Sequence, residues 1–176
     1  MYLLCTDGVA EFDLATQRFK TLLQGNVDAI YFNEKLYIGK REEVFVYNES
    51  TGNFDLFYHL AGKNITLSCL HLDKNKNLWM GTTSNGIYCL SEDKNLSRPV
   101  TKGNITSIYE DSSNELWIGS WEEGLYRVKT DGSIENLRHN PMNTNSLCSN
   151  FVRSCCEDNS LSLIHISEPT RHLRIS

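Results

Sequence analysis

The sequence lacks the features that mark several large classes of protein. Its 17 Lys and Arg are outnumbered by 22 Asp and Glu, which gives a net charge of −5 and leaves no basic stripe to neutralise nucleic-acid phosphates. No apolar run approaches the roughly 20 residues that cross a bilayer, and no basic segment followed by an apolar one opens the chain. We therefore expect no nucleic-acid partner, and membrane attachment only through parts of a longer protein outside this chain.

Metal-binding and catalytic patterns are also missing. The six cysteines include no C-x-x-C spacing, so we interpret them as small buried hydrophobes, and the adjacent Cys155 and Cys156 should point to opposite faces of a strand. Residues 73–77 (Asp-Lys-Asn-Lys-Asn) begin like a calcium loop, but Leu78 stands at its glycine position, which favours a β-turn. No Ser-His-Asp or Cys-His constellation is visible from spacing. The sequence therefore predicts no catalytic residue, metal or cofactor.

What the sequence does contain is an internal repeat. Quartets of an apolar residue, an aromatic residue, an apolar residue and a glycine start at residues 36, 78 and 116, which are 42 and 38 residues apart. That spacing is typical of β-propeller blades, whose repeats are about 40–50 residues long. In two copies an aspartate lies six residues before the aromatic residue, as Asp73 does before Trp79 and Asp111 before Trp117. The repeating unit is a strand, a polar turn, a strand ending in glycine, a short loop and another strand.

This repeat predicts an all-β fold. Short strands bounded by Asn, Asp, Gly and Ser indicate antiparallel hairpins, and residues 116–118 and 44–47 are apolar on both faces, as in a sheet covered on two sides. We expect a partial β-propeller of about three four-stranded antiparallel blades, with a partial blade at each end. The blade units are predicted at residues 26–63, 64–103 and 104–149, and the partial blades at residues 1–25 and 150–160.

The end of the sequence breaks the repeat. Residues 150–158 imitate residues 104–111, but the quartet due after them is missing. In its place, residues 161–171 (Leu-Ser-Leu-Ile-His-Ile-Ser-Glu-Pro-Thr-Arg) resemble the conceptual translation of a transposon-type sequencing adapter. We therefore interpret residues 161–176 as a non-native tail that makes few specific contacts and is dispensable.

The repeat resembles a known family, the two-component regulator propeller repeats. Residues 116–127 (Leu-Trp-Ile-Gly-Ser-Trp-Glu-Glu-Gly-Leu-Tyr-Arg) resemble its core motif, and residues 138–147 resemble its linker into the next blade, whereas the unit at 26–63 departs further, with Tyr37 in place of tryptophan. The resemblance implies the periplasmic sensor region of membrane-anchored regulators. These are commonly hybrid histidine kinases that respond to glycan fragments. It also implies a homodimeric intact protein whose catalytic parts lie outside this chain.

The candidate ligand-binding residues lie in one loop of the 104–149 unit. Trp121 could stack on the face of a sugar, or it could belong to blade-to-blade packing. Glu122 and Glu123 could accept hydrogen bonds from hydroxyls, but adjacent loop carboxylates rarely face each other across a glycoside, which favours a solvated turn over acid-base catalysis. The leading hypothesis is binding of a small soluble ligand, expected to be an oligosaccharide. The alternatives are a protein-interaction scaffold and a propeller lyase or hydrolase.

Overall fold

The computed structural model describes residues 1–61, 65–97, 99–157 and 163–166. The chain divides into two compact units, Met1–Ile105 and Thr106–Ser176. Throughout the described ranges the regular structure is β-strand, with turns and bends between the strands, and the chain is nowhere helical there. The described residues accordingly provide no helix able to cross a membrane.

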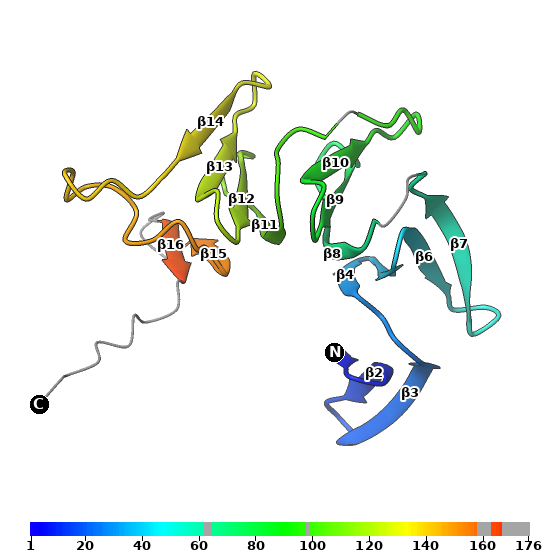
Figure 1. Cartoon of the computed structure of the whole chain (residues 1–176). Helices are drawn as coiled ribbons and strands as arrows, with labels where there is room; N and C mark the ends of the chain where they lie inside the picture. Colours follow the sequence, from blue (N-terminus) through cyan, green and yellow to red (C-terminus); the bar gives the residue numbers. More distant parts are fainter. Residues whose placement is uncertain (62–64, 98, 158–162, 167–176) are drawn as a thin grey trace, which may run out of the picture. The chain divides into compact units, whose positions relative to one another are not determined.

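The first unit contains three antiparallel sheets, in the orders β1-β2-β3, β4-β5-β6-β7 and β8-β9-β10 (Figure 1). Within each sheet, every strand pairs with the next one along the chain, because short polar turns bring the chain straight back on itself. The strands are β1 (Tyr2–Cys5), β2 (Gly8–Asp13), β3 (Arg18–Gln24), β4 (Ala29–Asn33), β5 (Lys35–Lys40), β6 (Glu43–Asn48), β7 (Asn53–His59), β8 (Leu67–Leu72), β9 (Leu78–Thr82) and β10 (Ile87–Leu90).

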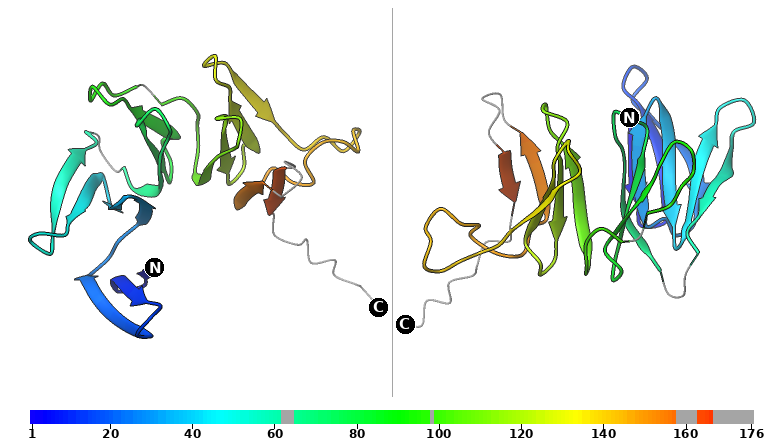
Figure 2. Two further views of the ribbon diagram at one scale, coloured as in Figure 1. Left: turned by 180° about the vertical axis from the view of Figure 1, so that it is seen from behind. Right: turned by 90° about the horizontal axis from the view of Figure 1, so that it is seen from above.

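The core of the first unit lies between its sheets, which follow one another as layers (Figure 2). One cluster joins Val44 and Leu60 of the second sheet region to Leu67, Leu78 and Met80 of the third, all almost inaccessible to water. Packing of this kind requires apolar side chains on both faces of an inner strand. All five residues of β9 are buried, which agrees with the two-sided pattern in the sequence.

The second unit contains a four-stranded sheet, β11-β12-β13-β14, and a two-stranded sheet, β15-β16. Leu125 of the larger sheet, Val152 and Cys155 form its buried cluster, with Trp117 packed against them. The strands are β11 (Ile105–Glu110), β12 (Leu116–Ser120), β13 (Leu125–Val128), β14 (Ile134–Leu137), β15 (Ser154–Glu157) and β16 (Leu163–Ile166).

The predicted all-β, partial β-propeller fold is confirmed. The quartets at residues 36, 78 and 116 lie on β5, β9 and β12, which belong to three different sheets. The sheets β4–β7 and β11–β14 have the expected four strands, but β8–β10 has three. On its outer edge Ser97 N donates to Cys89 O, and Ser97 Oγ accepts from Cys89 N at 2.9 Å. A side-chain oxygen thus takes the place of a backbone carbonyl there, which explains why the segment after β10 is not a regular strand.

Close approach between strands explains the glycine that ends each quartet. A Cβ atom added to Gly81 would lie 2.4 Å from Cys69 Sγ and 2.8 Å from Ile105 Cγ2. Carbon atoms cannot approach sulfur or carbon that closely without a shift of the neighbours. Glycine at this position is therefore a packing requirement.

Two expectations need correction. Residues 163–166 of the tail form β16 and pair with β15, so the expectation of few specific contacts is wrong for them; backbone pairing needs only N–H and C=O groups and does not depend on a selected sequence. The rest of the tail lies outside the described residues. The cysteines were expected to be buried, but Cys5, Cys148 and Cys156 are exposed. Cys155 is buried beside exposed Cys156, as alternation along a strand predicts, and burial raises the pKa of the Cys155 thiol to about 11.

Candidate ligand site in the second unit

The loop between β12 and β13 carries the three candidate residues. Ser120 Oγ donates a hydrogen bond to Gly124 O at 2.8 Å and accepts one from Glu123 N at 2.9 Å, which closes the loop into a tight turn. Gly124 has a φ of +81°, and a Cβ atom there would lie 2.3 Å from Leu137 O. The loop therefore requires glycine at this position, and its conformation is fixed by contacts on both sides.

Trp121 projects from this turn and is 49% exposed. Its ring meets Phe151 edge to face, with the ring centroids 4.2 Å apart and the planes at 85°. Gly124 N donates to Asn150 O, and Val152 N donates to Ser120 O, each at 3.0 Å, so the segment around Phe151 is held against the loop. One side of the Trp121 ring thus packs on Phe151, and about half of the side chain faces solvent.

Glu123 is paired with a residue that sequence reasoning did not single out as a partner. Its carboxylate lies 2.7 Å from the Arg138 guanidinium, and Arg138 also donates to Glu122 O at 3.2 Å. All of these groups are partly exposed, so the ion pair contributes more to orientation than to stability. The Glu123 carboxylate is therefore engaged by Arg138, and Glu122 meets the same guanidinium through its backbone oxygen. The turn interpretation holds, with Arg138 as an added neighbour.

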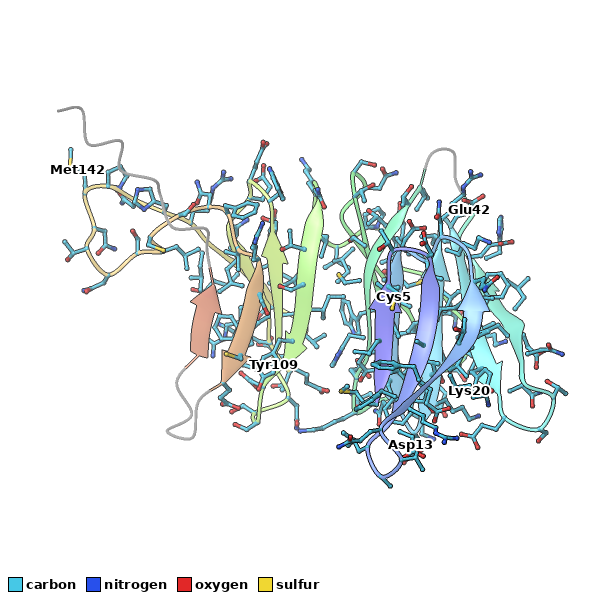
Figure 3. The ribbon with its side chains drawn as sticks, turned by 90° about the horizontal axis from the view of Figure 1, so that it is seen from below. Cys5, Asp13, Lys20, Glu42, Tyr109 and Met142 are labelled. Atoms are coloured by element: carbon cyan, nitrogen blue, oxygen red, sulfur yellow. The ribbon has the colours of Figure 1, made fainter. Side chains whose placement is uncertain are left out.

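The linker after β14 is ordered by its own hydrogen bonds. His139 N donates to Asn150 Oδ1 at 2.7 Å, and His139 Nδ1 lies 2.6 Å from Leu147 O. The tip of this loop carries Met142, which is 95% exposed (Figure 3). The linker thus supplies Arg138 and Phe151 to the neighbourhood of Trp121 from its two ends.

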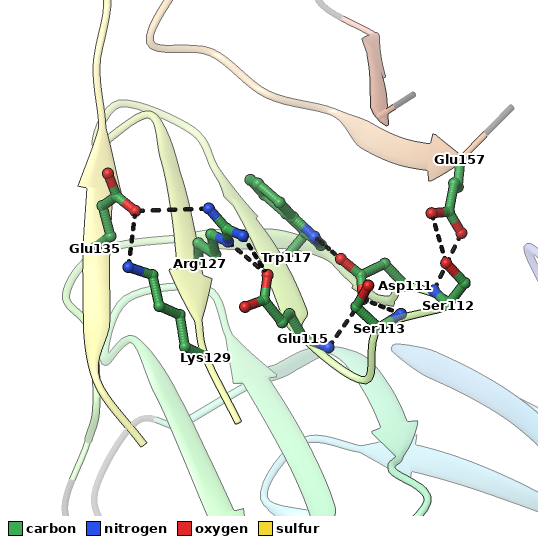
Figure 4. A network of polar contacts seen from close by, with 9 residues as sticks. All are labelled: Asp111, Ser112, Ser113, Glu115, Trp117, Arg127, Lys129, Glu135 and Glu157. Atoms are coloured by element: carbon green, nitrogen blue, oxygen red, sulfur yellow. Dashed lines mark hydrogen bonds and ion pairs between the residues drawn. The ribbon is translucent and has the colours of Figure 1, made fainter. Parts of the chain in front are cut away.

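The aspartate six residues before each quartet tryptophan accepts the indole hydrogen bond. Figure 4 shows the copy in the second unit, where Trp117 Nε1 donates to Asp111 Oδ2 at 2.8 Å. The backbone N–H groups of Ser113 and Glu115 donate to the other carboxylate oxygen, each at 2.9 Å. Burial disfavours ionisation of Asp111, but the Trp117 and backbone hydrogen bonds and the Arg127 charge together hold its pKa below the usual value.

The same aspartate–indole hydrogen bond, which we call the Asp–Trp lock, occurs in the first unit. Trp79 Nε1 donates to Asp73 Oδ2 at 2.8 Å, and Asn77 donates to the same carboxylate through its backbone N at 2.8 Å and its side-chain Nδ2 at 2.9 Å. All three hydrogen bonds lie within one hairpin. The β-turn interpretation of residues 73–77 is therefore confirmed. Sequence reasoning noted the recurring Asp and Trp but did not predict the bond between them.

A pocket in the first unit was also missed. It has a volume of about 440 Å³, and its lining includes the rings of Tyr2 and Tyr47 and the carboxylates of Glu49 and Asp55. Burial, followed by the charges of Glu11 and Glu49, raises the pKa of Tyr2. Because its residues come from two sheets, no single repeat copy signals it. It is a second place where a polar ligand could contact aromatic rings.

The described residues offer no metal-binding site. In these parts of the chain, no group of three or more His, Cys, Asp or Glu side chains is arranged to hold an ion. Two of the carboxylates in this unit have other partners: Asp111 accepts from Trp117, and Glu123 pairs with Arg138. The arrangement at Trp121 suits binding through an aromatic face and hydrogen bonds.

The fold and the repeated Asp–Trp lock define the chain as part of a β-propeller. The family model of the two component regulator propeller matches residues 59–84 and 99–122, which contain the Trp79 and Trp117 quartets. These two segments are therefore similar to two component regulator propeller repeats. No match was found among the curated proteins.

Similar solved structures share this fold. The extracellular domain of the hybrid two component system BT4673 of B. thetaiotaomicron has a TM-score of 0.77 and 19% identity over 93% of this chain and 24% of that one. The corresponding domain of BT3049 has a TM-score of 0.75 and 21% identity over 93% of this chain and 23% of that one. Virginiamycin B lyase from Staphylococcus aureus has a TM-score of 0.69 and 13% identity, over 92% of this chain and 56% of that one. The chain spans about a quarter of the two extracellular domains, and at these identities the likeness concerns the fold alone.

Proposed function

We propose that this chain is part of the ligand-sensing, periplasmic propeller of a two component sensor, and that its ligand is an oligosaccharide. The observation that carries the proposal is the half-exposed Trp121, held on a fixed loop within a two component regulator propeller repeat. The intact protein would be a homodimer that passes the binding event to a signalling module. This chain contributes binding and no catalytic step.

The chemistry around Trp121 matches what a sugar offers. A pyranose ring presents C–H groups on its faces and hydroxyls at its rim, so it can stack on an indole while its hydroxyls bond to polar groups beside the ring. Glu122 stands next to Trp121 as a hydroxyl acceptor, and the Arg138–Glu123 pair provides both donors and an acceptor at fixed positions. Binding of this kind loses little side-chain entropy, because the loop is already closed by its own hydrogen bonds.

Two alternatives have less support. A protein-interaction scaffold would call for a large continuous exposed apolar patch. In the first unit the exposed Met1, Leu14 and Phe19 do gather, but they line one pocket of about 390 Å³ whose wall also carries charged side chains. A propeller lyase has only the fold-level likeness to virginiamycin B lyase in its favour. We therefore do not propose either.

Calorimetric titration of the 176-residue chain with a panel of neutral and acidic oligosaccharides tests the proposal. Trp121→Ala should weaken binding of the recognised oligosaccharide by about 1–3 kcal/mol, the scale of removing a large apolar contact. Phe19→Ala, which removes another exposed aromatic side chain, should leave binding unchanged. Circular dichroism of each variant separates lost binding from lost fold.

The same titration distinguishes the two candidate locations. Tyr47→Ala and Glu49→Gln alter the 440 Å³ pocket of the first unit without touching Trp121. Loss of binding in these variants, with Trp121→Ala unaffected, would move the ligand site to that pocket. If a folded wild-type chain bound no oligosaccharide of the panel, the assignment of ligand class would be wrong.

A further inference from the structure

The aromatic position of the repeat is not equivalent in all copies. Trp79 and Trp117 each donate an indole hydrogen bond to an aspartate six residues earlier. In the 26–63 unit this position is Tyr37, and the residue six positions before it is Tyr31, whose hydroxyl donates to Leu72 O at 3.1 Å. This copy therefore has a smaller ring and no aspartate lock.

A pocket lies beside this smaller ring. Tyr37 lines a cavity of about 240 Å³ inside the first unit, between the sheets β4–β7 and β8–β10. Its walls are formed by the Tyr37 and Phe57 rings and by leucines of the neighbouring sheet region, Leu72, Leu78 and Leu90. The two rings meet edge to face, with centroids 5.6 Å apart and planes at 83°.

The mouth of this pocket is positively charged. Lys76, Glu92 and Lys94 are among the lining residues, and Lys76 Nζ lies 3.3 Å from a Glu92 carboxylate oxygen. Lys94 Nζ instead lies 5.4 Å from the centroid of the Phe57 ring and, within the described ranges, has no carboxylate as an ion-pair partner. The Lys94 ammonium group at the edge of this apolar cavity is thus not neutralised by a neighbouring carboxylate in the described ranges.

We propose that this pocket binds a small carboxylate with an aromatic body. The ring would pack between Tyr37, Phe57 and the leucines, and the carboxylate would lie at the mouth near Lys94. A saccharide is a poor occupant, because its hydroxyls would exchange water for walls that offer few hydrogen bonds. A cation is disfavoured by Lys94 itself. This site is separate from the Trp121 loop and does not depend on the proposed sensing function.

The inference is tested with 3-phenylpropionate and its neutral analogue 3-phenylpropanol, each titrated into the 176-residue chain by ligand-observed NMR. A ligand of this size in a small pocket should bind in about the millimolar range. The carboxylate should bind about two- to fivefold more tightly than the alcohol, the range for an exposed charge pair. Lys94→Gln should abolish this difference while retaining alcohol binding. Lys40→Gln, at the far end of β5 from the pocket, should leave the difference intact.

A second variant tests the location. Tyr37→Trp introduces the residue type found at the equivalent positions Trp79 and Trp117, so the fold should survive. The larger ring should fill the cavity, and binding of both probes should be lost. Tyr37→Phe should retain binding. The proposal is overturned if a folded wild-type chain binds neither probe, if the two probes bind equally, or if binding persists in folded Tyr37→Trp. If Tyr37→Trp fails to fold, the Lys94→Gln comparison decides.

Discussion

The buried carboxylate of Asp73 should stabilise the first unit strongly. Asp73 is 7% exposed, and it accepts hydrogen bonds from Asn77 N, Asn77 Nδ2 and Trp79 Nε1, the last from a ring that is itself 8% exposed. In Asp73→Ala the indole N–H loses its acceptor where water has little access, and such an orphaned donor costs about 1–3 kcal/mol. The two Asn77 donors are less buried, and their loss adds less. We expect a total destabilisation of about 2–4 kcal/mol.

This loss is large on the scale of folding. Domains of ordinary size are stable by about 5–15 kcal/mol, so Asp73→Ala should visibly lower the urea midpoint measured by circular dichroism. Asp13→Ala is the matched control: Asp13 is the exposed last residue of β2 (Figure 3) and accepts backbone hydrogen bonds from Ala15 and Thr16 in the turn that follows. Asp73→Asn keeps one acceptor oxygen and should fall between them. If Asp73→Ala destabilised the chain no more than Asp13→Ala, the lock would have no energetic role.

Three further outcomes follow from the structure. Because hydrogen bonding lowers the pKa of Asp111, the stability from its ionised form is present above pH 3.8, the ordinary value, and is lost as pH falls through the lower folded value. The free energy of unfolding, measured by urea titration at neutral pH and again below pH 3.8, should differ less between the two pH values in Trp117→Phe than in the wild type. An unchanged difference would contradict the role given to the Trp117 hydrogen bond. Gly81→Ala should destabilise by about 1–3 kcal/mol in thermal unfolding, because its Cβ meets Cys69 Sγ, and a neutral effect would refute the packing argument. Deleting residues 161–176 should leave the unfolding midpoint unchanged despite the loss of β16, whereas an appreciable drop would show that the tail belongs to the fold.

The repeat made much of the fold predictable. Strand period, polar turns and the glycine that ends each quartet are local signals, so the placement of the quartets on strands of separate sheets could be predicted. The irregular edge beyond β10 could not, because it depends on Ser97 Oγ accepting from Cys89 N, a competition between side chain and backbone.

The candidate site was predictable only in part. Trp121 and its loop stand out within the repeat motif, but the Glu123–Arg138 pair joins residues on either side of β13 and β14, and the Trp121–Phe151 contact spans the whole linker. Such contacts depend on how the linker folds back. The pocket beside Tyr37 likewise arises between two sheets, although the change from tryptophan to tyrosine was visible in the sequence.

The most direct test of the proposed sensing role is ligand-dependent signalling by the full-length protein that contains this segment. A ligand shifts a signalling equilibrium only if it binds one state more tightly than the other, so under the proposed function an activating oligosaccharide should produce a dose-dependent change in the output of the signalling module. Trp121→Ala should move the half-maximal concentration upward by about 5- to 150-fold, equivalent to about 1–3 kcal/mol, and leave the maximal response unchanged. A response curve that is identical in wild type and Trp121→Ala, or no response to the oligosaccharide that binds the isolated chain, would contradict the proposal.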